Sequence, residues 1–138
     1  YMTGGALVNC TVASNWCNAA RIGGGICKTG GGVTNSVVWS NFAGTAVNDI
    51  TASANVSYSC ASELTPGVNG NLASDPRFRS LPQLNVHLTP GSPCQNAALI
   101  MPWMAGGVDL DGRNRIMAGG ADMGCYEAPA LGSLFIAR

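Results

Sequence analysis

Short runs of β-branched and apolar residues, broken by glycine and asparagine, recur along the first part of the chain. Residues 4–16 align with residues 30–42 at an offset of 26, and six of these thirteen positions are identical. A second glycine-led block begins at Gly23, and a weaker echo runs over residues 50–60. A repeat of this length, built from short runs that end at glycine or asparagine, predicts a solenoid of short strands.

Other repeat folds do not fit the same pattern. No window has the apolar spacing of an amphipathic helix, and the regular leucines of leucine-rich repeats are missing. We therefore predict an all-β fold, a parallel β-helix whose coils stack about 4.8 Å apart.

Asparagines occupy equivalent positions of the repeat. Asn9 aligns with Asn35, and Asn15 aligns with Asn41. Asparagine tolerates the left-handed backbone that a corner requires, and its amide can bond to the amide of the next coil. We expect ladders of asparagine amides at these corners.

The character of the chain changes near residue 61. Residues 1–61 contain only Arg21, Lys28 and Asp49 as charged residues, whereas all seven prolines follow them. An exposed terminal coil needs a cover over its unpaired strand edges. We predict β-helix coils in residues 1–61, and a last coil with an irregular, loop-rich C-terminal cap in residues 62–138, all within one structural domain.

The composition of the chain argues against several classes of function. The chain has 138 residues, enough for one domain, and its formal net charge is zero. That balance gives no electrostatic attraction to nucleic acid or to an anionic membrane surface. No stretch of 18 apolar residues is present, so we expect no membrane insertion by this segment.

Ordered motifs in the second half resemble a known family. They are Val56-Ser57-Tyr58-Ser59-Cys60, residues 70–78, residues 88–97, Asp109-Leu110-Asp111-Gly112-Arg113-Asn114-Arg115 and Asp122-Met123-Gly124-Cys125-Tyr126-Glu127. Together they resemble the terminal module of the bacterial "choice-of-anchor Q" proteins. The resemblance implies a right-handed parallel β-helix of the pectate-lyase-like type and an extracellular or cell-surface location, and it implies no particular enzyme. The sequence departs from the family pattern at residues 95–98, where the family has an aspartate.

The predicted coils contain few side chains that could act in catalysis. Cleavage of a glycosidic bond needs two carboxylates, or a base with a charge stabiliser, about 5 to 10 Å apart. Asp49 is the only carboxylate in residues 1–60. We therefore predict no catalytic residues and no cofactor, and we expect that this chain is not an enzyme.

The acidic residues of the cap have two interpretations. Asp109 and Asp111 match half of a calcium-binding loop, although Arg113 takes the place of the next oxygen ligand. The alternative is an Asp-Gly turn whose carboxylates pair with Arg113 or Arg115. We expect Asp122 and Glu127 to pair with Arg115 and to clamp the cap.

Cysteines and aromatic residues give further candidates. The six cysteines lack zinc-site spacing, and their even number suggests an oxidising setting. We predict disulfides between Cys94 and Cys125 and between Cys17 and Cys27, with Cys10 and Cys60 unpaired and buried. Trp39 and Tyr58 are candidates for a sugar-stacking strip, with core packing as the alternative.

These observations favour a non-catalytic structural or adhesive module of a secreted or cell-surface bacterial β-helix protein. Its partners would be neighbouring coils of a longer chain or further copies of itself, including self-assembly into fibres. The alternatives are the C-terminal fragment of a polysaccharide-active enzyme, either a lyase or a glycoside hydrolase, and a carbohydrate-binding module.

Overall fold

The computed structural model describes residues 1–19, 23–52 and 54–129 of the chain. Regular structure in these residues consists of short β-strands and three 3₁₀ helices, without an α-helix. This agrees with the predicted all-β class. Among the described residues, no helix is long and apolar enough to cross a membrane.

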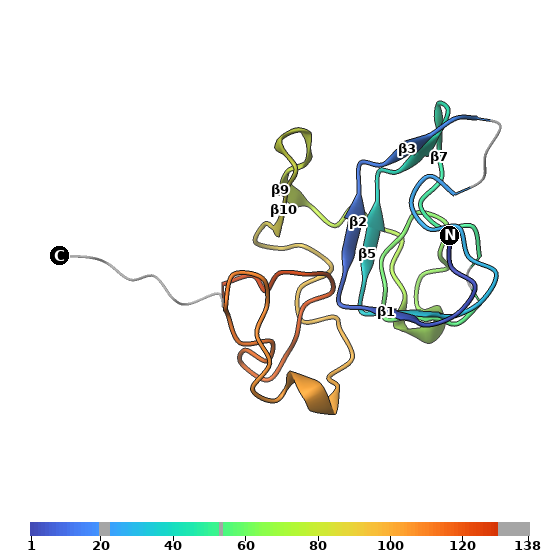
Figure 1. Cartoon of the computed structure of the whole chain (residues 1–138). Coiled ribbons are helices and arrows are strands. Elements are labelled where there is room, and N and C mark those ends of the chain that lie inside the picture. The colour runs from blue at the N-terminus through green and yellow to red at the C-terminus, as the bar shows by residue number, and fades with distance from the viewer. Residues whose placement is uncertain (20–22, 53, 130–138) are drawn as a thin grey trace.

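Two stretches of chain lie side by side in parallel over three consecutive strands. The first pass, residues 6–17, contains β1 (Ala6–Val8), β2 (Thr11–Ala13) and β3 (Trp16–Cys17). The second pass, residues 32–43, contains β4 (Gly32–Thr34), β5 (Val37–Trp39) and β6 (Phe42–Ala43). Each strand of the first pass pairs with its equivalent at the offset of 26 that the sequence repeat predicts, and Figure 1 shows β2 beside β5.

A third stretch continues this arrangement at a shorter offset. The strand β8 (Val56–Ser57) pairs in parallel with β4, with Val56 opposite Val33. Single parallel bridges then join Val37 to Cys60 and Cys60 to Leu72. We call residues 56–62 the third pass. The strand β7 (Ala46–Val47), which follows the second pass in the chain, pairs antiparallel with β6.

The chain turns at the same positions in the first and second passes. Asn9 and Asn35 have left-handed backbone, with φ of 49° and 53°. At the next corner the left-handed residues are Ser14 and Ser40, with φ of 57° and 58°. The expectation that Asn15 and Asn41 themselves take this conformation is therefore wrong, because the serine before each asparagine makes the turn.

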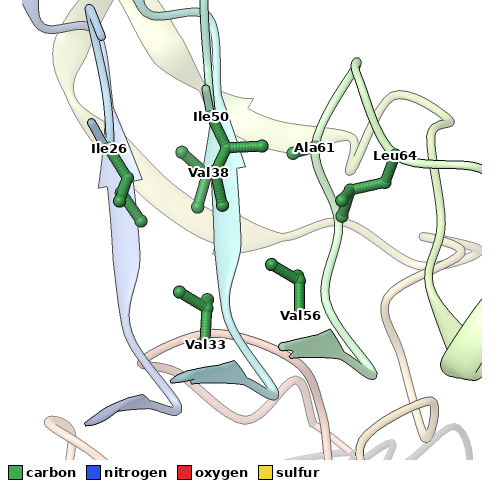
Figure 2. Close-up of a cluster of buried hydrophobic side chains, with 7 residues drawn as sticks. All are labelled: Ile26, Val33, Val38, Ile50, Val56, Ala61 and Leu64. Atoms are coloured by element: carbon green, nitrogen blue, oxygen red, sulfur yellow. The ribbon is translucent and has the colours of Figure 1, made fainter. Parts of the chain in front are cut away.

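Apolar side chains stack in columns between the passes. Val33 lies over Val56, Ile26 bridges to Ile50, and Val38 neighbours Ala61 (Figure 2). Leu7 and Val12 of the first pass pack on this cluster, which also includes Leu64. Identical registers place like side chains above one another, so each pass adds a layer to one narrow core.

The C-terminal segment, residues 73–129, contains little regular structure. The 3₁₀ helix η1 (Val68–Gly70) precedes it. The elements of the segment itself are β9 (Phe78–Ser80), η2 (Leu81–Gln83), β10 (Asn85–Leu88) and η3 (Pro102–Met104). The strands β9 and β10 form an antiparallel pair. A second buried cluster joins this segment to the passes, and its buried members are Val37, Cys60, Leu88, Cys94 and Met123.

Candidate functional site

Asparagine side chains link successive passes, as the sequence predicts, and three of the four, Asn9, Asn35 and Asn41, are buried. The Asn15 side-chain amide donates to Oδ1 of Asn41 at 2.9 Å, and the Asn41 amide donates to Oδ1 of Asp49 at 3.0 Å. At the other corner, Nδ2 of Asn35 lies 3.3 Å from Oδ1 of Asn9. The predicted amide ladders are confirmed at both positions.

The ladder that contains Asn35 also holds the C-terminal segment. Asn35 Nδ2 donates to the Leu99 carbonyl at 2.8 Å, and Asn35 Oδ1 accepts from the Leu99 backbone N–H at 2.8 Å. Asn9 Nδ2 donates to the Asp122 carbonyl at 3.3 Å. Fully satisfied side chains such as Asn35, which is wholly buried, fix the relative position of two segments 64 residues apart.

Asp49 is also wholly buried, and its contacts are structural. Its Oδ1 accepts from the Asn41 backbone N–H at 2.8 Å, and its Oδ2 accepts from the Ser62 hydroxyl at 2.7 Å. Glu63 in turn accepts from the backbone N–H of Asp49 at 2.8 Å. The Asp49 carboxylate therefore joins the second pass to the third, and Glu63 holds the backbone of Asp49 in place. Of the basic residues in the coils, Lys28 donates to the Ala54 carbonyl, while Arg21 lies outside the described residues.

Arg115 and Glu127 form a buried ion pair in the C-terminal segment, which confirms the predicted clamp. Arg115 Nη1 lies 3.1 Å from Glu127 Oε1, and the side chains are 6% and 1% exposed. The same guanidinium donates to the carbonyls of Gly124 and Cys125 at 3.0 Å each. Asp122 differs from the expectation, because its two carboxylate oxygens accept from the backbone N–H groups of Asn96 and Ala128.

The calcium candidates Asp109 and Asp111 lie in a turn and are occupied by hydrogen-bond donors. Asp109 accepts three backbone N–H bonds, from Asp111, Arg113 and Glu127. Burial alone would raise the pKa of Asp109, but these bonds outweigh it and hold the pKa below its ordinary value. Asp111 Oδ2 lies 3.1 Å from Arg113 Nη1. No group of three or more potential metal-ligating side chains occurs in the described part of the chain, and calcium binding stays a prediction.

A pocket of about 210 Å³ lies beside the ion pair. It is lined by Gln95, Asn96, Met117, Ala118, Asp122, Glu127, Ala128 and Pro129. Burial raises the pKa of Asp122, and burial raises that of Glu127 to about 7. Glu127 is the stronger acid–base candidate of the two, since a group that titrates near neutral pH can exchange a proton. Their four oxygens nonetheless all accept hydrogen bonds within the protein.

The raised pKa of Glu127 predicts a pH-dependent stability. Between the ordinary carboxyl value of 4.5 and about 7, the folded protein retains a proton that the unfolded chain has released. The stabilisation is therefore complete below pH 4.5 and is lost as the pH rises towards 7. We expect the melting temperature of the wild type relative to Glu127→Gln to fall by on the order of 5 °C between pH 5 and pH 8. A constant difference measured by calorimetry across this range would contradict the prediction.

The predicted sugar-stacking residues pack against the interior. Trp39 and Tyr58 are both half-buried and lie against the second cluster. The two residues do not occupy equivalent positions. Trp39 lies in β5, opposite Ala13 of β2, whereas Tyr58 is a left-handed corner residue with φ of 46°. These contacts favour the core-packing alternative for both rings.

The cysteine pairs differ from the prediction. All six cysteines are free, so the predicted disulfides Cys94–Cys125 and Cys17–Cys27 are not formed. The two cysteines of the C-terminal motifs have different surroundings. Cys94 belongs to the second buried cluster, whereas the Cys125 backbone N–H donates to Thr11 Oγ1 at 3.2 Å. Cys17 lies opposite Ala43, and the Cys27 carbonyl accepts from the Met2 N–H. Cys60 is unpaired and buried as predicted, while Cys10 is only half-buried.

One surface cluster was missed by sequence reasoning. His87 lies in β10 and is half-buried; its Nε2 is 3.0 Å from Asp111 Oδ2, and its ring stacks on Tyr126 at 3.9 Å. Nδ1 lies 2.7 Å from Asn85 Oδ1. Only the alternation of Asn85 and His87 within the strand signals this arrangement in the sequence, because the other partners come from distant loops.

Comparison with known proteins finds no matching family model, no matching curated protein and no matching solved structure.

Proposed function

We propose that this chain is a non-catalytic structural or adhesive module, whose passes are coils of a right-handed parallel β-helix. The observation that carries the proposal is the repeated register. Three successive strands pair in parallel at one offset, with matching corners and an amide ladder at each corner. Stacking of equivalent strands, apolar columns and asparagine ladders is what a rigid rod requires. The resemblance to the choice-of-anchor Q module is part of this proposal.

The placement of the carboxylates favours a scaffold over a catalyst. Asp49 accepts the backbone N–H of Asn41, and Glu63 accepts that of Asp49. Asp109 accepts the backbone N–H groups of Asp111, Arg113 and Glu127. A general acid or base must be able to reach its substrate within hydrogen-bond distance. These carboxylates are instead engaged with backbone N–H groups, where they stabilise the packing of strands and loops.

The first pass offers an edge for further pairing. Within the described ranges of the chain, β1 and β2 are each paired on one side only, and β3 likewise pairs only with β6. An unpaired parallel edge presents backbone donors and acceptors to another strand. Trp16, which is 67% exposed, lies on this pass. We propose that the partner here is a neighbouring coil or a second copy of the chain, in a protein that is secreted or displayed on a bacterial surface.

An activity assay tests the proposal. We expect the purified chain to release no unsaturated or reducing sugar ends from pectin, alginate or related polymers, with or without calcium. The variants Asp122→Asn and Glu127→Gln serve as matched controls, because both carboxyl groups line the pocket. Release by the wild type that either variant abolishes would overturn the proposal and place the chain among the polysaccharide-active enzymes.

A further inference from the structure

The hydrogen-bond ladders between the passes run in one direction. The Asn15 backbone N–H donates to Asn41 Oδ1 at 3.0 Å, and the Asn41 backbone N–H donates to Asp49 Oδ1 at 2.8 Å. At an earlier position of the repeat, the Cys10 backbone N–H donates to Ser36 Oγ at 3.2 Å. In each case the donor precedes the acceptor in the chain, so a pass supplies acceptors to whatever pass comes before it.

At the first pass this direction leaves an acceptor open. The Asn15 side-chain amide donates to Asn41 Oδ1 and to the Ala13 carbonyl, but among the described residues no donor reaches Asn15 Oδ1. Asn15 is exposed, whereas Asn41 is wholly buried. Continuation of the ladder would place the donor for Asn15 one pass before the first.

Gly4 and Gly30 occupy equivalent positions of the repeat but have different surroundings. A Cβ atom on Gly30 would lie 2.3 Å from the Thr3 carbonyl oxygen, a contact that only glycine avoids. A Cβ atom on Gly4 would have nothing within 4 Å among the described residues, and the φ of Gly4 is not positive. The close approach of another backbone is a common reason for glycine beside a strand. A carbonyl one pass before Thr3 would supply that reason at Gly4.

The apolar side chains of the first pass are covered less completely than their equivalents in the second. Val33 and Val38 are wholly buried, while Leu7 and Val12, which lie opposite them, are only half-buried. Trp16 at the end of the pass is largely exposed. A layer on the open side would complete the burial of these residues, as the first pass completes that of the second.

We propose that the edge of the first pass receives a further parallel pass of the same repeat, in the register at which the first pass meets the second. Such a pass would bring a backbone N–H to Asn15 Oδ1, a carbonyl to Gly4 and apolar side chains to Leu7 and Val12. A second copy of the chain fits this edge less well. Isologous pairing sets the same edge against itself, and the Asn15 amide, which is bound to Asn41, cannot supply the missing donor. The inference rests on the stacked passes of the proposed function and names the partner of their open edge.

Extension of the full chain by one repeat tests the proposal. A copy of residues 4–29 is inserted between Thr3 and Gly4, which keeps the spacing of the repeat. We expect the melting temperature to rise by on the order of 5 °C, because each added repeat contributes an interface with its neighbour. The control carries the same inserted residues in scrambled order and should show no gain. An extended chain that melts no higher than the unmodified chain, or that does not unfold cooperatively, would overturn the proposal.

Alanine at the two equivalent glycines tests the register. In the unmodified chain, Gly30→Ala is expected to lower the melting temperature by about 10 °C and Gly4→Ala by about 1 °C or less, because only Gly30 faces a carbonyl. In the extended chain, Gly4→Ala at the original position should cost as much as Gly30→Ala. An effect of Gly4→Ala that stays small in the extended chain would refute the register.

Analytical ultracentrifugation tests the second copy as the occupant. We expect the unmodified chain to stay monomeric over a wide concentration range. A dimer that Trp16→Ser dissociates would assign the edge to a second copy and overturn the proposal. Sugar release in the activity assay would remove the proposed function without altering any of these measurements, so the two failures are distinguishable.

Discussion

Replacement of Asp49 by alanine is expected to destabilise the fold by about 3 to 4 kcal/mol, because it leaves buried donors without acceptors. The Asp49 carboxylate accepts from the backbone and side-chain N–H groups of Asn41 and from the Ser62 hydroxyl. Both Asp49 and Asn41 are wholly buried, so water cannot replace the lost oxygens. Urea unfolding monitored by circular dichroism measures the change.

Asp75→Ala is the matched control for this experiment. The Asp75 carboxylate also accepts a backbone N–H, from Arg77 at 2.8 Å, but at an exposed site where water can take its place. We expect a cost of at most about 1 kcal/mol for this variant. Equal effects of Asp49→Ala and Asp75→Ala would show that the ladder between the passes contributes no special stability.

Removal of Arg115 is expected to have the second large effect. Arg115→Ala removes the cation that pairs with the buried Glu127 carboxylate and the donor to the buried Gly124 carbonyl. Loss of one partner of a buried ion pair costs about 3 to 5 kcal/mol, because the other charge stays uncompensated. The raised pKa of Glu127 would partly offset this loss below neutral pH, where the carboxyl group can take up a proton. The midpoint of chemical unfolding at pH 8 therefore measures the full effect.

Arg113→Ala provides the comparison within the same turn. Arg113 also reaches Glu127, through the backbone carbonyl at 2.9 Å, and pairs with Asp111 on the surface. Its side chain is 38% exposed, so the expected cost is about 1 kcal/mol or less. If Arg113→Ala destabilised the protein as much as Arg115→Ala, burial of the Arg115–Glu127 pair would not be the source of the effect.

The repeated part of the chain was predictable because its interactions recur at one spacing. The identities between residues 4–16 and 30–42 gave the offset at which β1, β2 and β3 pair. Even there, the left-handed residue at one corner was misplaced by one position, to Asn15 rather than Ser14. Both residue types tolerate such a turn, so composition alone does not choose between them.

The third pass shows the limit of pattern reading. Val56, Tyr58 and Cys60 alternate as in a strand, yet Tyr58 turns the chain and separates β8 from the bridge at Cys60. Gly70 makes this possible, because a Cβ atom there would lie 2.7 Å from the Tyr58 ring. A close approach between residues 58 and 70 leaves no periodic signal in the sequence.

By itself, the sequence determined the β-rich class, the repeat offset, the asparagine ladders and the Arg115–Glu127 pair. Each follows from local pattern or from residues close together in the chain. The tertiary structure alone decided that Cys94 lies in the same buried cluster as Cys60, that Asn35 holds Leu99 and that His87 meets Asp111. These contacts depend on how an irregular segment docks on the passes. The energy of that docking is spread over many buried side chains, and no short motif encodes it.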